Sequence, residues 1–277
     1  MGKVVVASDI NKAKAGVEII GEVIRLAGDD PQVKQAAGEL GKTAVTITKT
    51  INNALLPLAA VNFAFDKARK YFAERFEADL QEKAKQIPPE ALVEPKASVA
   101  GPALQALAFA HEEDVLRNLF LELIAGSMDA RKASSAHPAF VEVLKQIQSE
   151  EANLLKSLLR SQNHPIGQIR RVTKSTGGYN VVCSHVLGIV NLKTKQPAVT
   201  QGLPAMIDNW VRLGLVNVSY DAHLTEESRY DWLKDRPEMT ALAVEPADSD
   251  HKIEWARGVL VVTDFGKQFA KAVGVPV

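Results

Sequence analysis

Apolar residues recur at spacings of three and four through the first half of the chain, and this periodicity predicts amphipathic helices. Asp30-Pro31 has the residue types of a helix start. The apolar stripe that follows comprises Leu40, Ala44, Ile47, Ile51, Leu55 and Leu58, and it resumes at Phe65, Ala68, Phe72, Phe76 and Leu80. Pro57 removes one helical hydrogen bond, so we expect a kink there. The pattern predicts long helices over residues 1–86.

A second helical block is predicted over residues 87–161, after a linker at residues 87–95. One helix has a wide apolar face made of Val115, Leu116, Leu119, Phe120, Leu123 and Ile124. Three acidic residues lie at the N-terminus of this helix, where the helix dipole favours negative charge: Glu112, Glu113 and Asp114. After a loop of small residues, His137-Pro138 is expected to restart a helix, and Ser149 to begin the next.

After residue 162 the pattern changes to short runs rich in β-branched residues, separated by helix signals. The runs that predict strands are residues 179–183, 186–192, 215–219 and 258–262. Helices are predicted over residues 204–213, 226–234 and 264–273, the last one capped by Thr263. This order of elements is typical of a winged helix, with residues 206–213 in the recognition position and residues 219–259 as an enlarged wing.

The predicted fold class is therefore mainly α: a helical N-terminal region followed by an α+β, winged-helix-like C-terminal domain. The domain boundaries that follow from the pattern are residues 1–86, 87–161 and 162–277. The chain has 277 residues, and at about 150 residues per domain this length suits about two domains or one domain with an extension.

The amino-acid composition fits a globular protein of a reducing compartment but does not indicate a reaction. Hydrophobic residues make up 46% of the chain and charged residues 24%, which is ordinary for a soluble globular protein. The single cysteine fits a reducing compartment, so we expect a cytoplasmic protein. The most apolar run, residues 54–65, is shorter than the ~18 apolar residues of a membrane span and is interpreted as a buried helix.

The formal net charge is zero, yet charge is unevenly distributed along the C-terminal part. Residues 152–207 contain no acid, whereas residues 208–250 contain ten acids and four bases. The bases of the acid-free stretch are Lys156, Arg160, Arg170, Arg171, Lys174, Lys193 and Lys195. They are candidate nucleic-acid-binding residues, because phosphate contacts are largely electrostatic. The alternative is that the basic stretch pairs with acids elsewhere in the fold.

Cys183 and His185 would share one face of a regular strand, as a nucleophile with its base or as two metal ligands. No second cysteine, CxxC or HExxH accompanies them, so a buried thiol beside an ordinary histidine is the favoured interpretation. No phosphate-binding loop is present either. The sequence therefore predicts no catalytic residue, metal site or cofactor, and a non-enzymatic protein is favoured.

One stretch supports a family assignment. Residues 114–129, followed by residues 137–147 and 149–155, resemble the abortive-infection alpha family of bacterial proteins. The resemblance implies a role in phage defence but no known activity. The residues of this motif are structural in character: Asp114, Arg117, Phe120, Asp129, His137, Pro138 and Phe140. Two polar pairs among them, Asp114 with Arg117 and Asp129 with His137, are candidates for buried contacts that stabilise the helical block.

The resulting hypothesis is a phage-defence protein that binds or senses a phage or host component. Two alternatives remain open: a winged-helix regulator that binds nucleic acid, and an effector that acts on a membrane through residues 36–65. The long apolar stripe also suggests a homo-oligomer, in which such a stripe is often buried.

Overall fold

The computed structural model describes residues 64–191, 193–243 and 250–276. The predicted helix start at Asp30-Pro31, the stripe from Leu40 to Leu58 and the kink at Pro57 lie outside these residues. The chain divides into two compact units: unit 1 comprises residues 1–152 and 272–274, and unit 2 comprises residues 153–271 and 275–277. None of the described helices has the length and apolar character needed to cross a membrane.

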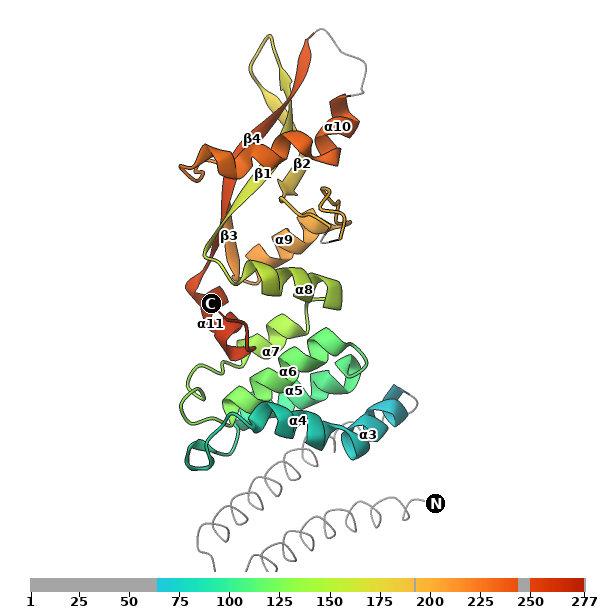
Figure 1. Ribbon diagram of the computed structural model, residues 1–277, viewed down its shortest axis with the longest axis vertical. Helices are drawn as coiled ribbons and strands as arrows, with labels where there is room; N and C mark the ends of the chain where they lie inside the picture. The colour runs from blue at the N-terminus through green and yellow to red at the C-terminus, as the bar shows by residue number, and fades with distance from the viewer. Residues whose placement is uncertain (1–63, 192, 244–249, 277) are drawn as a thin grey trace, which may run out of the picture. The chain divides into compact units, whose positions relative to one another are not determined.

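Unit 1 is helical in its described part, as the apolar periodicity predicts (Figure 1). Its elements are α3 (Ala64–Glu74), α4 (Phe76–Ala84), the 3₁₀ helix η2 (Pro89–Ala91), α5 (Ala97–Ala110), α6 (Asp114–Ser127) and α7 (Ala139–Leu144). A further helix, α8 (Ser149–Leu158), begins in unit 1 and continues into unit 2. Helix α5 packs on α6, and the core between these helices and α7 includes the fully buried Leu107, Leu123 and Phe140.

The segment after α4, residues 87–95, is hydrogen-bonded to the loop that follows α6. Leu92 forms an isolated antiparallel bridge with Asp129. The Val93 amide donates to the Met128 carbonyl at 2.8 Å, and the Ala130 amide donates to the Ala91 carbonyl at 2.8 Å. The predicted linker at residues 87–95 is thus held against the loop that follows α6.

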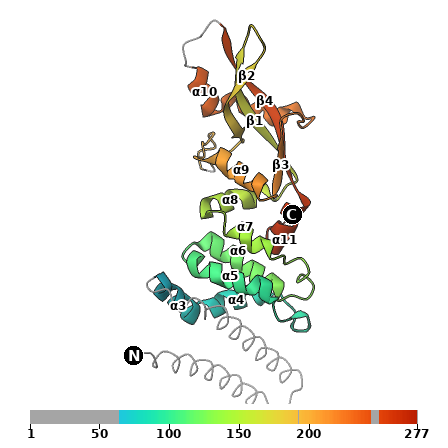
Figure 2. The ribbon, with the colours of Figure 1, turned by 180° about the vertical axis from the view of Figure 1, so that it is seen from behind.

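Unit 2 is built on a four-stranded antiparallel sheet in the order β2-β1-β4-β3 (Figure 2). The strands are β1 (Asn163–Thr173), β2 (Tyr179–Val186), β3 (Val216–Ser219) and β4 (His251–Val262). The helices are α9 (Leu203–Arg212), the 3₁₀ helix η3 (Glu227–Asp235), α10 (Pro237–Ala243) and α11 (Asp264–Ala272). A buried cluster of Ile169, Val186, Tyr230 and Leu233 joins η3 to the sheet.

The predicted fold class, mainly α with a winged helix, is wrong. The described residues are about 49% helical and 19% strand, with a curled four-stranded antiparallel sheet, so the fold is mixed α/β. Strand β1 was missed because its residues 168–171 place glutamine and two arginines around a single isoleucine, which obscures any alternation. The predicted wing, residues 219–259, instead contains η3, α10 and most of β4.

Several local predictions in unit 2 are confirmed. Helix α9 ends before Gly214, whose φ of 74° is a left-handed conformation that suits glycine. Thr263 caps α11, since its Oγ1 accepts a hydrogen bond from the Gly266 amide at 2.9 Å. The predicted strand over residues 186–192 is wrong: β2 ends at Val186, and the described residues that follow form an isolated bridge between Val190 and Pro197.

Candidate functional site

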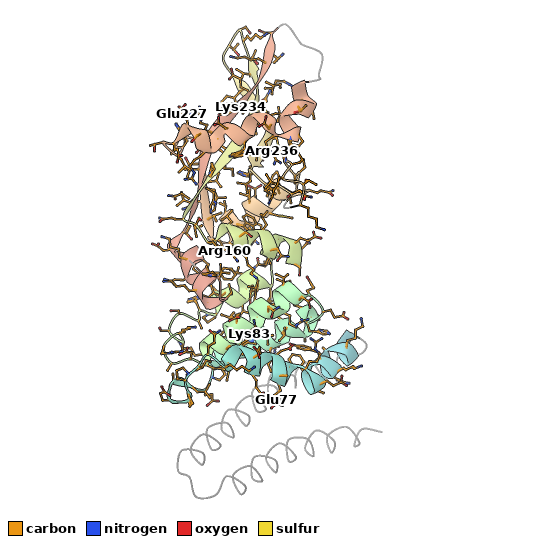
Figure 3. The ribbon with its side chains drawn as sticks, in the orientation of Figure 1. Glu77, Lys83, Arg160, Glu227, Lys234 and Arg236 are labelled. Atoms are coloured by element: carbon orange, nitrogen blue, oxygen red, sulfur yellow. The ribbon has the colours of Figure 1, made fainter. Side chains whose placement is uncertain are left out.

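The seven predicted basic residues do not lie on one element. Lys156 lies on α8, Arg160 follows it, Arg170 and Arg171 lie on β1, Lys174 lies in the β1–β2 turn, and Lys193 and Lys195 lie in the loop after β2 (Figure 3 labels Arg160). Arg170 and Arg171 are consecutive in a strand, so their side chains leave opposite faces of the sheet. Among the described residues, the two arginines of β1 therefore lie on opposite faces of the sheet and do not contribute to one basic surface.

Acids of the following stretch lie beside some of these bases. Arg170 is in register with Glu254 on the neighbouring strand β4. At the β1–β2 turn, the Lys174 amide donates to the Asp250 carbonyl at 2.7 Å, and the Ser175 hydroxyl donates to Asp250 Oδ2 at 2.9 Å. Asp250 of the acid-rich stretch thus lies at the β1–β2 turn, while the charge pairing of the seven bases with acids stays a prediction.

The most exposed apolar side chains of the sheet lie at the end of the β1–β2 hairpin. We define the ribbon tip as residues 170–182 and 250–254; Figures 1 and 2 show the hairpin loop and the start of β4 projecting beyond η3. Tyr179, Val181 and Val182 are 52%, 46% and 39% exposed. Clustered exposed apolar side chains mark interaction surfaces more often than isolated ones do.

An arginine stacks on the aromatic ring of the ribbon tip. The guanidinium carbon of Arg170 lies 4.1 Å from the centroid of the Tyr179 ring. The two residues come from the paired strands β1 and β2. Tyrosine and arginine are the residue types enriched at the energetic centres of interfaces. The ribbon tip thus combines apolar surface, an aromatic ring and positive charge.

Two irregularities in β2 lie next to the ribbon tip. Between the pairs Gly167–Val186 and Ile169–Cys183, β2 advances by three residues while β1 advances by two. The extra residue is a β-bulge, a feature that re-aims side chains and is frequent beside functional sites. His185 lies in this bulge and has a φ of 55°, a conformation that is uncommon for residues other than glycine.

The bulge directs His185 to two other segments of unit 2. Its Nε2 lies 3.0 Å from Oδ1 of Asp208 on α9, and its Nδ1 lies 3.1 Å from the Tyr220 hydroxyl. The same hydroxyl accepts a hydrogen bond from the His185 amide and donates one to the Gly167 carbonyl at 3.2 Å. Burial raises the pKa of Tyr220 to about 12, so the phenol stays protonated at neutral pH. We call Asp208, His185 and Tyr220 the histidine clamp.

The bulge also separates Cys183 from His185. Cys183 packs against the buried cluster that contains Ile169 and Val186, whereas His185 contacts Asp208 and Tyr220. Burial is the main factor that raises the pKa of the Cys183 thiol, and the nearby Glu238 carboxylate raises it further. A thiol that is hard to ionise is a poor nucleophile. The pair is therefore not arranged as a nucleophile and its base, and the described residues hold no cluster suited to a metal ion.

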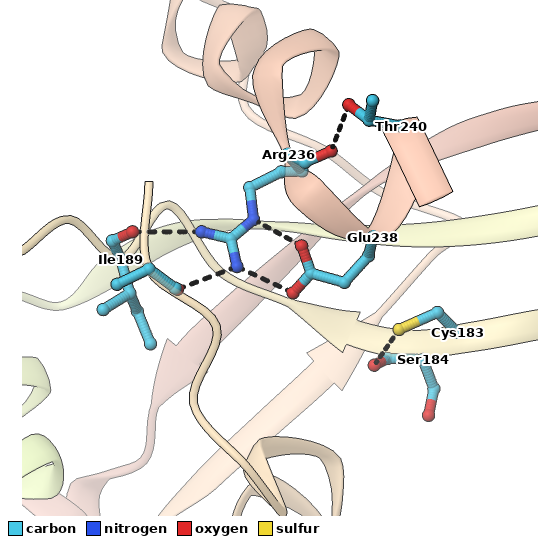
Figure 4. A network of polar contacts seen from close by, with 7 residues as sticks. Cys183, Ser184, Ile189, Arg236, Glu238 and Thr240 are labelled. Atoms are coloured by element: carbon cyan, nitrogen blue, oxygen red, sulfur yellow. Dashed lines mark hydrogen bonds and ion pairs between the residues drawn. The ribbon is translucent and has the colours of Figure 1, made fainter. Parts of the chain in front are cut away.

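A buried arginine fixes the loop that carries Lys193 and Lys195 (Figure 4). Arg236 is 1% exposed, and its guanidinium donates to both carboxylate oxygens of Glu238 at 2.9 and 2.7 Å. It also donates to the carbonyls of Ile189 and Ala198, both at 3.0 Å. The sequence contains no signal for this network, because two of its acceptors are backbone carbonyls in a distant loop.

The family-motif residues lie in the helical core of unit 1 and the loop after it. Phe120 and Phe140 are buried. Arg117 pairs with Asp114 at 2.6 Å and donates to the His111 carbonyl at 2.8 Å. His137 is exposed, and its Nδ1 accepts a hydrogen bond from the Ala139 amide at 3.1 Å, so it contacts the first turn of α7 together with Pro138.

Asp129 is buried, and its partner is Arg131. Asp129 Oδ1 accepts hydrogen bonds from the Arg131 amide at 3.0 Å and from Nε at 2.8 Å, and Oδ2 accepts one from Nη2 at 2.6 Å. Arg131 also donates to the Gln86 carbonyl. The hydrogen bonds from Arg131 lower the pKa of Asp129. These contacts tie the loop after α6 to the end of α4.

Asp129→Asn is expected to destabilise the protein by about 2 kcal/mol at neutral pH, since hydrogen bonds to a charged group are lost. A lowered folded-state pKa stabilises the fold above the unfolded carboxyl pKa of about 3.9, and this stabilisation is lost as pH falls through the folded-state value. Urea unfolding at pH 7 and at pH 3 measures the difference. Asp264→Asn, at an exposed carboxylate, is the control. If Asp129→Asn lowered the free energy of unfolding by the same amount at pH 3 as at pH 7, the stabilising role of the charged Asp129 would be contradicted.

Comparison with known proteins identifies a family. The pattern that describes abortive infection alpha proteins matches residues 68–273, which is most of the chain and includes residues of both units. No curated protein and no solved structure matches the chain. The match includes the motif residues around α6 and α7 as well as the ribbon tip and the histidine clamp. The chain belongs to the abortive infection alpha family.

Proposed function

We propose that this protein acts in phage defence by binding a phage or host macromolecule through the ribbon tip. Family membership supports the defence role. The observation that favours the ribbon tip is the exposure of Tyr179 and Val181 beside Arg170, whose guanidinium stacks on the Tyr179 ring and whose backbone is in register with Val181. Burial of exposed apolar area on binding is favourable, and the arginine can donate hydrogen bonds that orient the partner.

Hydrogen bonds of the histidine clamp connect the end of β2, next to the ribbon tip, to other segments of unit 2. The histidine clamp joins β2 to α9, and the Tyr220 hydroxyl joins β2 to the Gly167 carbonyl on β1. A surface that is already ordered loses less conformational entropy on binding than a mobile one. This rigidity suits the recognition of a macromolecule, and the proposal places that recognition in the cytoplasm.

Phage plating tests the defence role. Cells with and without the gene are challenged with a broad panel of phages, and plaques are counted. We expect fewer plaques on the cells that carry the gene for at least one phage. Equal plaque numbers for every phage would contradict the proposal.

A second candidate function is binding to nucleic acid, favoured by the stacking of Arg170 on Tyr179. Single-stranded nucleic acids bind surfaces that combine aromatic rings with positive charge, and binding weakens as salt rises. Retention of random DNA and RNA at ~50 mM salt tests this candidate. If neither is retained, a protein partner is favoured.

Two further predictions have tests of their own. Size-exclusion chromatography tests the predicted homo-oligomer. Leakage of a dye from liposomes tests the alternative that the protein acts on a membrane.

A further inference from the structure

Strand β2 lies at one edge of the sheet. The order β2-β1-β4-β3 gives it β1 as a neighbour on one side, and no strand of the described part of the chain lies on its other side. An edge strand presents a row of N–H and C=O groups with which a further strand can pair. Natural proteins usually protect such an edge with charged side chains, proline or a bulge. Residues 179–182 contain no charge and no proline, and the bulges of β2 lie after Val181.

The hydrogen-bond pattern of the β1–β2 hairpin shows which backbone groups of β2 point outward. The Thr173 amide donates to the Gly178 carbonyl at 2.8 Å, so these two residues form a hydrogen-bonded pair. Along an antiparallel ladder, pairs that exchange hydrogen bonds alternate with pairs that do not. Counted from Gly178, Asn180 belongs to a bonded pair, whereas Tyr179 and Val181 do not. The N–H and C=O groups of Tyr179 and Val181 therefore point away from β1.

We call residues 179–182, with these outward donors and acceptors, the β2 edge. All of its residues are exposed, and exposure decreases from Cys183 onward. The stacking of Arg170 on Tyr179 involves the two side chains and leaves the outward backbone groups accessible. The β2 edge is thus short, uncharged and able to pair with an added strand.

The ribbon tip around the β2 edge has a net positive charge. It contains four bases and two acids, namely Arg170, Arg171, Lys174 and Lys252 with Asp250 and Glu254. Glu254, which is in register with Arg170, pairs with Lys252. Among the described residues no carboxylate pairs with Arg170, whose Nε donates to Gln168 Oε1 at 2.8 Å. A carboxylate on an added strand would therefore gain a charge-assisted hydrogen bond, which is about twice as strong as a neutral one.

The same charge makes a second copy of the chain a poor occupant of the β2 edge. Two such edges paired antiparallel about Val181 would place two positive ribbon tips in one sheet. Side chains of directly paired residues share a face, so Arg170 of both copies would lie on the same face. Like charges on neighbouring strands are destabilising. A segment that carries an acid has the opposite effect.

We propose that the β2 edge is a strand-addition site, to which an extended acidic segment of a partner protein adds as a fifth strand of the sheet. Main-chain hydrogen bonds to Tyr179 and Val181 provide affinity, and contacts of alternate side chains with the ribbon tip provide specificity. A carboxylate of the segment pairs with Arg170. The inference rests on the proposed function, because it names the class of macromolecule that the ribbon tip binds.

A display library of random nine-residue peptides tests the proposal on the purified full chain. We expect the selected peptides to alternate apolar with polar residues and to contain aspartate or glutamate. Val181→Pro removes one outward N–H, and an edge strand tolerates proline where the missing N–H faces solvent, so this variant should fold. It should bind the selected peptides at least about tenfold more weakly than the wild type does. Val199→Pro, at an exposed valine outside the ribbon tip, is the control and should bind them normally.

Backbone N-methylation of a selected peptide gives a second test that leaves the protein unchanged. In an added strand, only every second N–H of the peptide faces β2. We expect methylation at those alternate positions to weaken binding about tenfold, and methylation at the positions between them to have little effect. An effect without this period of two would overturn the proposal.

The remaining outcomes separate this proposal from the proposed function. Failure to select any peptide, or equal binding of the selected peptides to the wild type and Val181→Pro, would overturn strand addition. Displacement of the peptides by random single-stranded DNA would assign the site to nucleic acid, and a dimer that Val181→Pro dissociates would assign it to a second copy; either result would also overturn the proposal. Phage plating without protection would contradict the defence role and leave the peptide result standing.

Discussion

Arg236→Ala is expected to destabilise unit 2 by about 3–5 kcal/mol, the range for removing one partner of a buried ion pair. The variant leaves the Glu238 carboxylate without its guanidinium and removes the donor to the Ile189 and Ala198 carbonyls. The charge left on Glu238, which is only 20% exposed, costs more than the pair contributes when it is intact. Urea unfolding followed by tryptophan fluorescence measures the change, since the three tryptophans are Trp210, Trp232 and Trp255.

Lys234→Ala is the matched control for Arg236→Ala. Lys234, labelled in Figure 3, lies two residues away and also pairs with an acid, Asp231, at 2.9 Å, but both side chains are exposed. Exposed pairs contribute about 0–1 kcal/mol, so this variant should unfold close to the wild type. If both variants are equally stable, the buried network of Arg236 does not stabilise unit 2.

Gly266→Ala is expected to destabilise unit 2 by about 3 kcal/mol, at the upper end of the usual cost of overpacking. A Cβ at Gly266 would lie 2.2 Å from the Leu215 carbonyl oxygen, and that backbone atom immediately precedes β3. The first turn of α11 can approach the sheet this closely only because residue 266 has no side chain. Thermal unfolding monitored by circular dichroism checks the prediction.

Gly126→Ala is the control for Gly266→Ala. Gly126 lies within α6, and a Cβ there would meet its nearest atom, the Ala272 carbonyl oxygen, at 3.6 Å. Alanine is favoured over glycine in a helix interior by about 0.5–1 kcal/mol, so this variant should be as stable as the wild type or more stable. A Gly266→Ala protein that matched Gly126→Ala would refute the close-approach argument.

Local signals in the sequence predicted much of the helical structure because each depends on neighbouring residues. The His137-Pro138 restart, the Thr263 cap and the end of α9 before Gly214 all need only backbone propensity and one hydrogen bond. These features hold whatever the remainder of the chain does. The family resemblance depends on the same block, and the match over residues 68–273 confirms it.

The sheet could not be predicted in the same way. Strand β1 places arginines at two consecutive positions, one toward each face, so no apolar alternation identifies it. The bulge at His185 breaks the rule that residues two apart share a face, so Cys183 and His185 do not share the face that a regular strand would give them. The histidine clamp and the Arg236 network depend on contacts between distant segments, and such contacts leave no local pattern.

The central claim, that the ribbon tip recognises the partner in phage defence, is tested most directly by plating phages on cells that express a ribbon-tip variant. Tyr179→Ser combined with Val181→Ser removes exposed side chains, so it should fold and accumulate like the wild type. The control combines Val199→Ser with Val211→Ser, two exposed valines of unit 2 outside the ribbon tip. We predict that the ribbon-tip variant loses protection while the control keeps it. Full protection by the ribbon-tip variant at wild-type abundance would contradict the claim.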